Sequence, residues 1–200
     1  MFYIIERQDQ LDQLHIGEEI FVQIIPLNEN YHPALQQISL IYVRWLKAHK
    51  GYMLCVNHSE SFSLELDAII NKLSKVDKIA VLDKKAFLHH FPSIDPQRIY
   101  DVSVYNNLNH VQNIDIPQYE TAVESDFKRK YYDASPSTLI PISKHYEENE
   151  NTFKNIQPII ESFVENNAYS FNNTALTETF FTIENNGIKV DKNCFLECYT

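Results

Sequence analysis

The chain has 200 residues, of which 44% are hydrophobic and 12% aromatic, a composition typical of a folded globular protein. Its 27 acidic and 17 basic residues give a formal net charge of −10. Neutralising phosphates supplies most of the affinity of nucleic-acid-binding domains, so this charge argues against strong DNA binding by the chain alone. We therefore expect any DNA contact to be weak and local, or supplied by another part of a larger protein.

The sequence has no apolar run near the roughly 20 residues that a membrane span needs. The apolar run at residues 1–5 is too short for a secretory signal. The three cysteines (Cys55, Cys194 and Cys198) form no ligand pattern with histidine, so we expect them to pack in the interior. We predict a cytoplasmic protein, bacterial or in a virus-infected cell, with no membrane partner.

Three β-rich runs come first in the chain, at residues 20–25, 38–45 and 51–56. The first is almost continuously apolar, as expected for a strand that is buried on both faces. The short links at 28–33 and 47–50 suit hairpins. These features predict an antiparallel meander of three strands.

Helices and strands then alternate. A helix is predicted over 63–74, because Ser63 is a suitable N-cap and apolar residues follow at helical spacing. The remaining elements are a strand at 78–82, a short helix at 84–91 ended by the proline that follows, and a fifth strand at 98–102. This element order predicts an α/β (α+β) fold with a ribonuclease H-like mixed five-stranded sheet flanked by helices.

The second half is more helical and more polar. Residues 106–133 have weak periodicity and are expected to form loops with short helices. An apolar stripe predicts a helix over 142–164, which Pro158 is expected to kink or interrupt. Another stripe, through Leu176, Phe180 and Ile183, predicts a helix that Asn186-Gly187 ends. We expect Asp191 to cap a further helix. The predicted domains are 1–165, and a helical junction over 166–200.

Residues 183–191, with the sequence Ile-Glu-Asn-Asn-Gly-Ile-Lys-Val-Asp, resemble the junction between the exonuclease-like and polymerase domains of family A DNA polymerases. Other landmarks of that family stand upstream in the same order: Val56-Asn57-His58, then Asp83-Lys84-Lys85-Ala86-Phe87, then Tyr100-Asp101 leading to Leu108-Asn109. The resemblance covers roughly residues 21–198. It implies an N-terminal segment acting in DNA replication, partnered by a polymerase domain or chain after Thr200. The abundance of Ile, Asn, Lys, Tyr and Phe suggests an AT-rich genome, such as that of a bacteriophage.

The proofreading site of that family holds two metal ions with carboxylates. Its first motif, Asp-x-Glu, matches residues 21–26 here, which contain no carboxylate. The aspartate of the second motif falls at or beside Phe87, and the third motif falls within 145–150, which has acids but not the aspartate. Too few ligands remain to hold hard cations against water. We therefore predict that nuclease activity, catalytic residues, bound metal and other cofactors are absent.

Some charged residues invite functional roles. Asp101, Glu147 and Glu148 are vestigial catalytic candidates. The favoured interpretations are capping a helix for Asp101 and forming a solvated helix face for Glu147, Glu148 and Glu150. Basic residues beside aromatics are typical of single-strand binding. The residues with this pattern are Lys128, Arg129, Lys130 and Tyr131, with Lys84 and Lys85 as a weaker instance. Because the surrounding charge is negative, a solvated loop is the simpler interpretation of residues 128–131.

Two alternatives stay open. The first is an active 3′–5′ exonuclease with displaced ligands, which would require Mg²⁺ or Mn²⁺ and would lose activity when Glu147 or Glu148 is replaced by alanine. The second is a stand-alone binding module that shares only the fold, since a fold does not fix a function.

Overall fold

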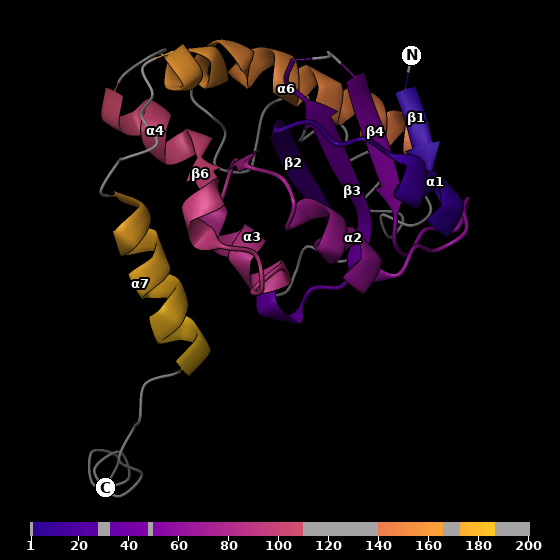
Figure 1. The fold of residues 1–200 in the computed structure, drawn as a ribbon, viewed down its shortest axis with the longest axis horizontal. Coiled ribbons are helices and arrows are strands. Elements are labelled where there is room, and N and C mark those ends of the chain that lie inside the picture. The colour runs from indigo at the N-terminus through magenta and orange to yellow at the C-terminus, as the bar shows by residue number, and fades with distance from the viewer. Residues whose placement is uncertain (1, 28–32, 48–49, 110–139, 166–172, 187–200) are drawn as a thin grey trace, which may run out of the picture.

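The computed structural model describes residues 2–27, 33–47, 50–109, 140–165 and 173–186. In this part of the chain, one six-stranded sheet has the order β1-β4-β3-β2-β5-β6 and carries helices on both faces (Figure 1). The strands are β1 (Phe2–Ile5), β2 (Glu19–Pro26), β3 (Ile38–Trp45), β4 (Lys50–Cys55), β5 (Lys78–Val81) and β6 (Ile99–Asp101). The helices are α1 (Gln8–Gln13), α2 (Leu66–Leu73), α3 (Lys84–His90), α4 (Val102–Asn109), α6 (Ile142–Glu165) and α7 (Asn173–Asn186), with short 3-10 turns η1 (Pro33–Leu35) and η2 (Pro96–Arg98).

Five of the strands have the predicted ribonuclease H-like arrangement. β2, β3 and β4 form the antiparallel meander, and β5 and β6 extend the sheet in parallel from β2. The prediction of five strands was wrong by one, because β1 pairs in parallel with β4 at the far edge. Its four residues are too few for periodicity to distinguish a strand from another short apolar run.

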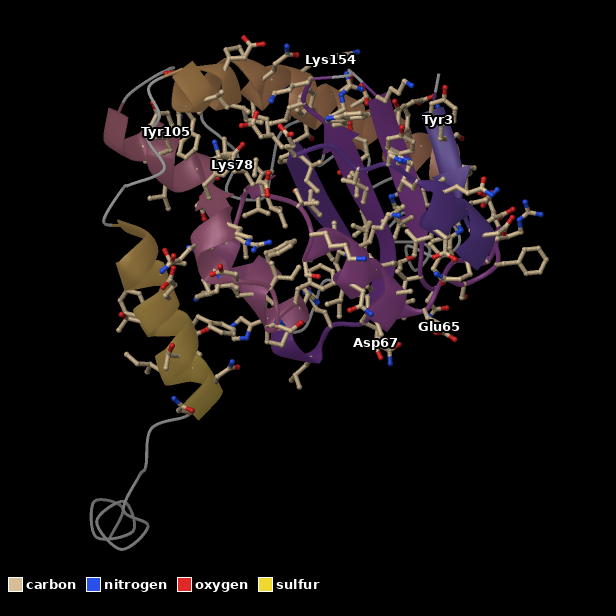
Figure 2. The ribbon with its side chains drawn as sticks, in the orientation of Figure 1. Tyr3, Glu65, Asp67, Lys78, Tyr105 and Lys154 are labelled. Atoms are coloured by element: carbon tan, nitrogen blue, oxygen red, sulfur yellow. The ribbon has the colours of Figure 1, made fainter. Side chains whose placement is uncertain are left out.

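The sheet separates two cores. Side chains alternate between the faces of a strand, and in β2 Ile20 and Val22 pack on the side of α2 and α3. Phe21 and Ile25 pack on the other side, under α4 and α6. The almost continuous apolar run of β2 thus fills both cores. On the second side α4 meets α6 where the ring of Tyr105 contacts Phe163 edge-on, with ring centroids 5.0 Å apart (Figure 2).

The helix boundaries follow their predicted signals with some exceptions. α2 begins at Leu66, three residues later than predicted, and α7 ends at Asn186 as the Asn-Gly pair predicts. The predicted interruption at Pro158 was wrong, because α6 runs through it from Ile142 to Glu165. A proline removes one helical hydrogen bond, whereas Phe153, Ile156, Ile159, Ile160 and Phe163 are all buried against the sheet along this helix. None of the helices in the described ranges is long and apolar enough to cross a membrane.

Two predicted features fall outside the described residues. Residues 110–133 of the predicted loop region are outside the described ranges. The helix that Asp191 was expected to cap is outside them as well. The division of the chain into 1–165 and 166–200 stays a prediction.

Candidate active site

The position of the first catalytic motif is an apolar face of β2. Phe21 is fully buried and Ile25 is 5% exposed. The ring of Phe21 lies 5.8 Å from the ring of Phe153 on α6, measured between centroids. Gln23, half-buried, lies between Phe21 and Ile25 on this face of the strand. The face therefore presents two apolar side chains and one amide where the family motif has carboxylates.

The position of the second motif lies on the opposite side of the sheet. Phe87 of α3 is 2% exposed and belongs to the core under α2 and α3. Its ring centroid is 4.9 Å from that of Phe91. The nearby acid, Asp83, caps α3 by accepting a hydrogen bond from the Ala86 amide at 2.8 Å. Ligands of a metal ion must converge, so Phe21 and Phe87 mark positions that could not share one.

The third motif supplies one inward-facing acid, Glu150 of α6. Its Oε1 atom accepts hydrogen bonds from the hydroxyls of Tyr42 at 2.7 Å and Tyr146 at 2.8 Å. The same oxygen pairs with Nη1 of Arg44 at 2.5 Å, and the side chains of Arg44 and Glu150 are only 11% and 13% exposed. Counting Glu150 with the solvated acids of its helix was therefore wrong. Its partners Tyr42 and Arg44 lie more than 100 residues away in the chain, whereas Tyr146 is four residues away on the same helix.

The phenols around Glu150 remain protonated donors. Burial, followed by the hydrogen bond to Glu150, raises the pKa of Tyr42 far above its usual value. The same two causes raise the pKa of Tyr146 to about 12. The glutamate is thus held by one cation and two neutral hydroxyls, an arrangement that fixes α6 to the sheet. This arrangement of Glu150 also requires glycine at position 51 on β4, because a Cβ atom there would lie 2.7 Å from Glu150 Oε1.

The other two acids singled out on α6 differ from Glu150. Glu147 is exposed and pairs with Lys144 at 2.6 Å, as expected for a solvated helix face. Glu148 is half-buried. Neither lies within a cluster of acids: in the described ranges no three His, Cys, Asp or Glu side chains are grouped so as to hold a metal ion.

Asp101 caps α4, as the sequence predicts. Its Oδ1 accepts a hydrogen bond from the Val104 amide at 2.9 Å, and its Oδ2 accepts one from the Lys84 amide at 2.8 Å. The carboxylate therefore joins the start of α4 to the start of α3. Burial raises the pKa of Asp101 to about 6, against the opposing effect of these hydrogen bonds.

His58, a landmark of the family resemblance, anchors the start of α6. Its Nδ1 accepts a hydrogen bond from the Glu60 amide at 3.2 Å, which leaves Nε2 to donate to the carbonyl of Ile140 at 2.9 Å. Glu60 in turn accepts a hydrogen bond from the Ile142 amide at 2.9 Å. Both ring nitrogens of His58 are thus engaged in the neutral form, and its role is structural rather than metal-ligating.

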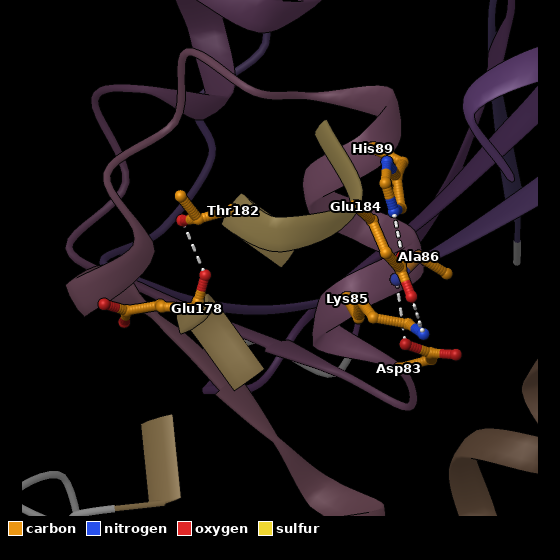
Figure 3. A network of polar contacts seen from close by, with 7 residues as sticks. All are labelled: Asp83, Lys85, Ala86, His89, Glu178, Thr182 and Glu184. Atoms are coloured by element: carbon orange, nitrogen blue, oxygen red, sulfur yellow. Dashed lines mark hydrogen bonds and ion pairs between the residues drawn. The ribbon is translucent and has the colours of Figure 1, made fainter. Parts of the chain in front are cut away.

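The predicted nucleic-acid-binding lysines of α3 pair with acids of α7, and Figure 3 shows this for Lys85 and Glu184. Lys84 has a side chain only 1% exposed, with Nζ 3.0 Å from Glu178. Nζ of Lys85, whose side chain is 40% exposed, lies 2.9 Å from Glu184. Their contact with nucleic acid stays a prediction. The other predicted residues, Lys128, Arg129, Lys130 and Tyr131, lie outside the described residues.

Comparison with known structures shows the fold. Brucella melitensis NrnC with bound Mg²⁺ is similar over 90% of this chain and 89% of its own, with a TM-score of 0.50 and 12% identity. The EXO domain of Aedes aegypti Nibbler aligns over 60% of this chain and 62% of its own, with a TM-score of 0.39 and 16% identity. No family model and no curated protein matches the sequence. The chain has a ribonuclease H-like, 3′–5′ exonuclease-like fold, and the likeness to NrnC points neither to a polymerase nor to a bacteriophage.

Proposed function

We propose that this chain is a nucleic-acid-associated domain that keeps the exonuclease-like fold without the two-metal nuclease reaction. The observation that carries the proposal is the apolar face of β2. Phe21, Gln23 and Ile25 stand there in place of carboxylates. A pair of divalent cations cannot be held by apolar side chains and one amide, and burying the ions there would be costly.

Glu150 does not restore the missing ligands. Its Oε1 already receives three donors, from Tyr42, Arg44 and Tyr146. Drawing this carboxylate onto a metal ion would leave the charge of Arg44 without its partner in an environment that excludes water. The arrangement favours a structural role for Glu150, which holds α6 against β3 and β4.

A more specific proposal is that the domain precedes a DNA polymerase domain or associates with a polymerase chain. It would then support the polymerase or guide DNA during replication. This proposal is supported by the ordered motifs of the sequence and by the end of α7 at Asn186, where the junction motif has its helix stop. A bacteriophage source belongs to this form of the proposal. An adjacent reading frame encoding a polymerase, and co-purification with its product, would support it. A genomic neighbourhood without a polymerase would contradict it.

The absence of nuclease activity is tested with a 3′-labelled single-stranded oligonucleotide and Mg²⁺ or Mn²⁺. We expect no metal-dependent loss of label from the oligonucleotide. The matched controls are Glu147→Ala and Glu148→Ala, purified in parallel, because the active-exonuclease alternative requires these acids. Metal-dependent degradation by the wild type that either variant abolishes would refute the proposal.

A further inference from the structure

The side of α7 that faces α3 carries two acids and one aromatic ring, and Figure 3 shows the two acids, Glu178 and Glu184. Glu178 pairs with Lys84 at 3.0 Å, and Glu184 pairs through one oxygen with Lys85 at 2.9 Å. The other carboxylate oxygen of Glu184 lies 2.9 Å from Nε2 of His89. We call Lys84 and Lys85, with the imidazole of His89 beside them, the α3 cation face. Each of its three nitrogens meets a carboxylate oxygen from α7.

The spacing of these residues places them on one side of α7. Residues 178, 181 and 184 are three apart and so fall within an arc of about 120° around the helix. The ring of Phe181, at the centre of this arc, contacts His89 edge-on at 5.0 Å between centroids. Phe180 and Ile183 lie on the other side and are 51% and 45% exposed. The described contact of α7 with α3 therefore combines carboxylate pairs with the packing of Phe181 against the core under α2 and α3. Two large apolar side chains of α7 face away from it.

Such a contact is easily reversed. In the pair of Lys85 with Glu184 both side chains are at least one-third exposed, and exposed ion pairs of this kind are weak and weaken further as salt screens the charges. Glu178 and Glu184 both retain 34% of their side-chain exposure, so water and ions reach these pairs. Glu178 of α7 is the carboxylate that meets the ammonium of Lys84, so displacing α7 would require another anion to pair with this cation. The helix thus belongs to the part of the molecule expected to open at low free-energy cost.

We propose that α7 competes with single-stranded nucleic acid for the α3 cation face, its carboxylates lying where backbone phosphates bind when the helix is displaced. The proposal rests on the nucleic-acid role proposed above. Lysine pairs with phosphate as readily as with carboxylate. α3 has seven residues and so spans about 10 Å, which suits a few nucleotides of one strand. In a chain with a net charge of −10, covering these cations would suppress binding, and uncovering them would permit it.

The test measures binding of a fluorescent oligothymidylate by anisotropy at low salt. The variant Glu178→Gln/Glu184→Gln frees the α3 cation face. Its control is Glu65→Gln/Glu161→Gln, which removes the same two charges from exposed sites on other elements. If the open form of the wild type is populated to about 10%, the first variant should bind about tenfold more tightly than the control. Adding Lys85→Gln should remove most of that gain.

A second variant, Phe181→Ala, loosens α7 without changing the net charge and should also tighten binding relative to the wild type. Tighter binding in both α7 variants, reduced by Lys85→Gln, supports the proposal. If the wild type binds and neither α7 variant binds more tightly, competition is refuted and the nucleic-acid role stands. If neither the wild type nor any variant binds, both proposals are refuted. Tryptophan fluorescence of the single Trp45 checks that each variant is folded.

Discussion

The largely buried pair of Arg44 and Glu150, whose side chains are 11% and 13% exposed, gives the sharpest test of how α6 is attached to the sheet. Replacing Arg44 by methionine keeps most of the side-chain length and its packing over the ring of Phe153, which lies 5.0 Å from the guanidinium carbon. It leaves the Glu150 carboxylate 13% exposed, with only the hydroxyls of Tyr42 and Tyr146 as donors. Removing one partner of a buried pair typically destabilises a protein by about 3–5 kcal/mol. We expect Arg44→Met to fall in this range.

A second substitution should recover part of the loss. Glu150→Gln removes the unpaired charge while keeping an oxygen that accepts hydrogen bonds from both tyrosines. The double variant Arg44→Met/Glu150→Gln should therefore be more stable than Arg44→Met by about 2 kcal/mol, the scale of a charged group buried without a partner. The free energy of unfolding is measured by urea titration at neutral pH, followed through the fluorescence of Trp45.

The matched control is Lys144→Met, which breaks the exposed pair with Glu147 on the same helix. It should change the free energy of unfolding by less than about 1 kcal/mol. The reasoning is refuted if Arg44→Met costs no more than this control, or if adding Glu150→Gln gives no recovery. Either result would mean that Glu150 is solvated or has other partners.

Two further predictions concern the same architecture. Gly51→Ala should destabilise the fold by about 1–3 kcal/mol in urea titration, because its Cβ would lie 2.7 Å from Glu150 Oε1 and would push this carboxylate out of its hydrogen bonds. Stability like that of the wild type would show that the Glu150 side chain shifts at no cost. The pKa of Asp101 is raised from 3.8 to about 6 in the folded state, so its contribution to stability is fully present below the lower value and is lost as the pH rises through about 6. Asp101→Asn should flatten the pH dependence of unfolding between these values, and an unchanged profile would contradict the assignment.

Local patterns in the sequence predicted most of the secondary structure. Apolar runs located five strands, and Asp101 caps α4 as its sequence position predicts. β1 was missed because four residues give too little periodicity, and its partner β4 lies almost 50 residues away. The continuity of α6 through Pro158 was missed because burial of its apolar face outweighs a local helix-breaking signal.

The candidate site also has one property that the sequence alone determined and others that only the structure shows. The lack of carboxylates at residues 21–26 of β2 is a property of composition along one strand, so the sequence alone determined it. The partners of Glu150 and Lys84 lie 106 and 94 residues away in the chain, so only the folded arrangement could show that one acid is neutralised by Arg44 and one cation is covered by α7. Charges of this kind leave no periodic trace, because their pairing depends on which faces the sheet and helices bring together.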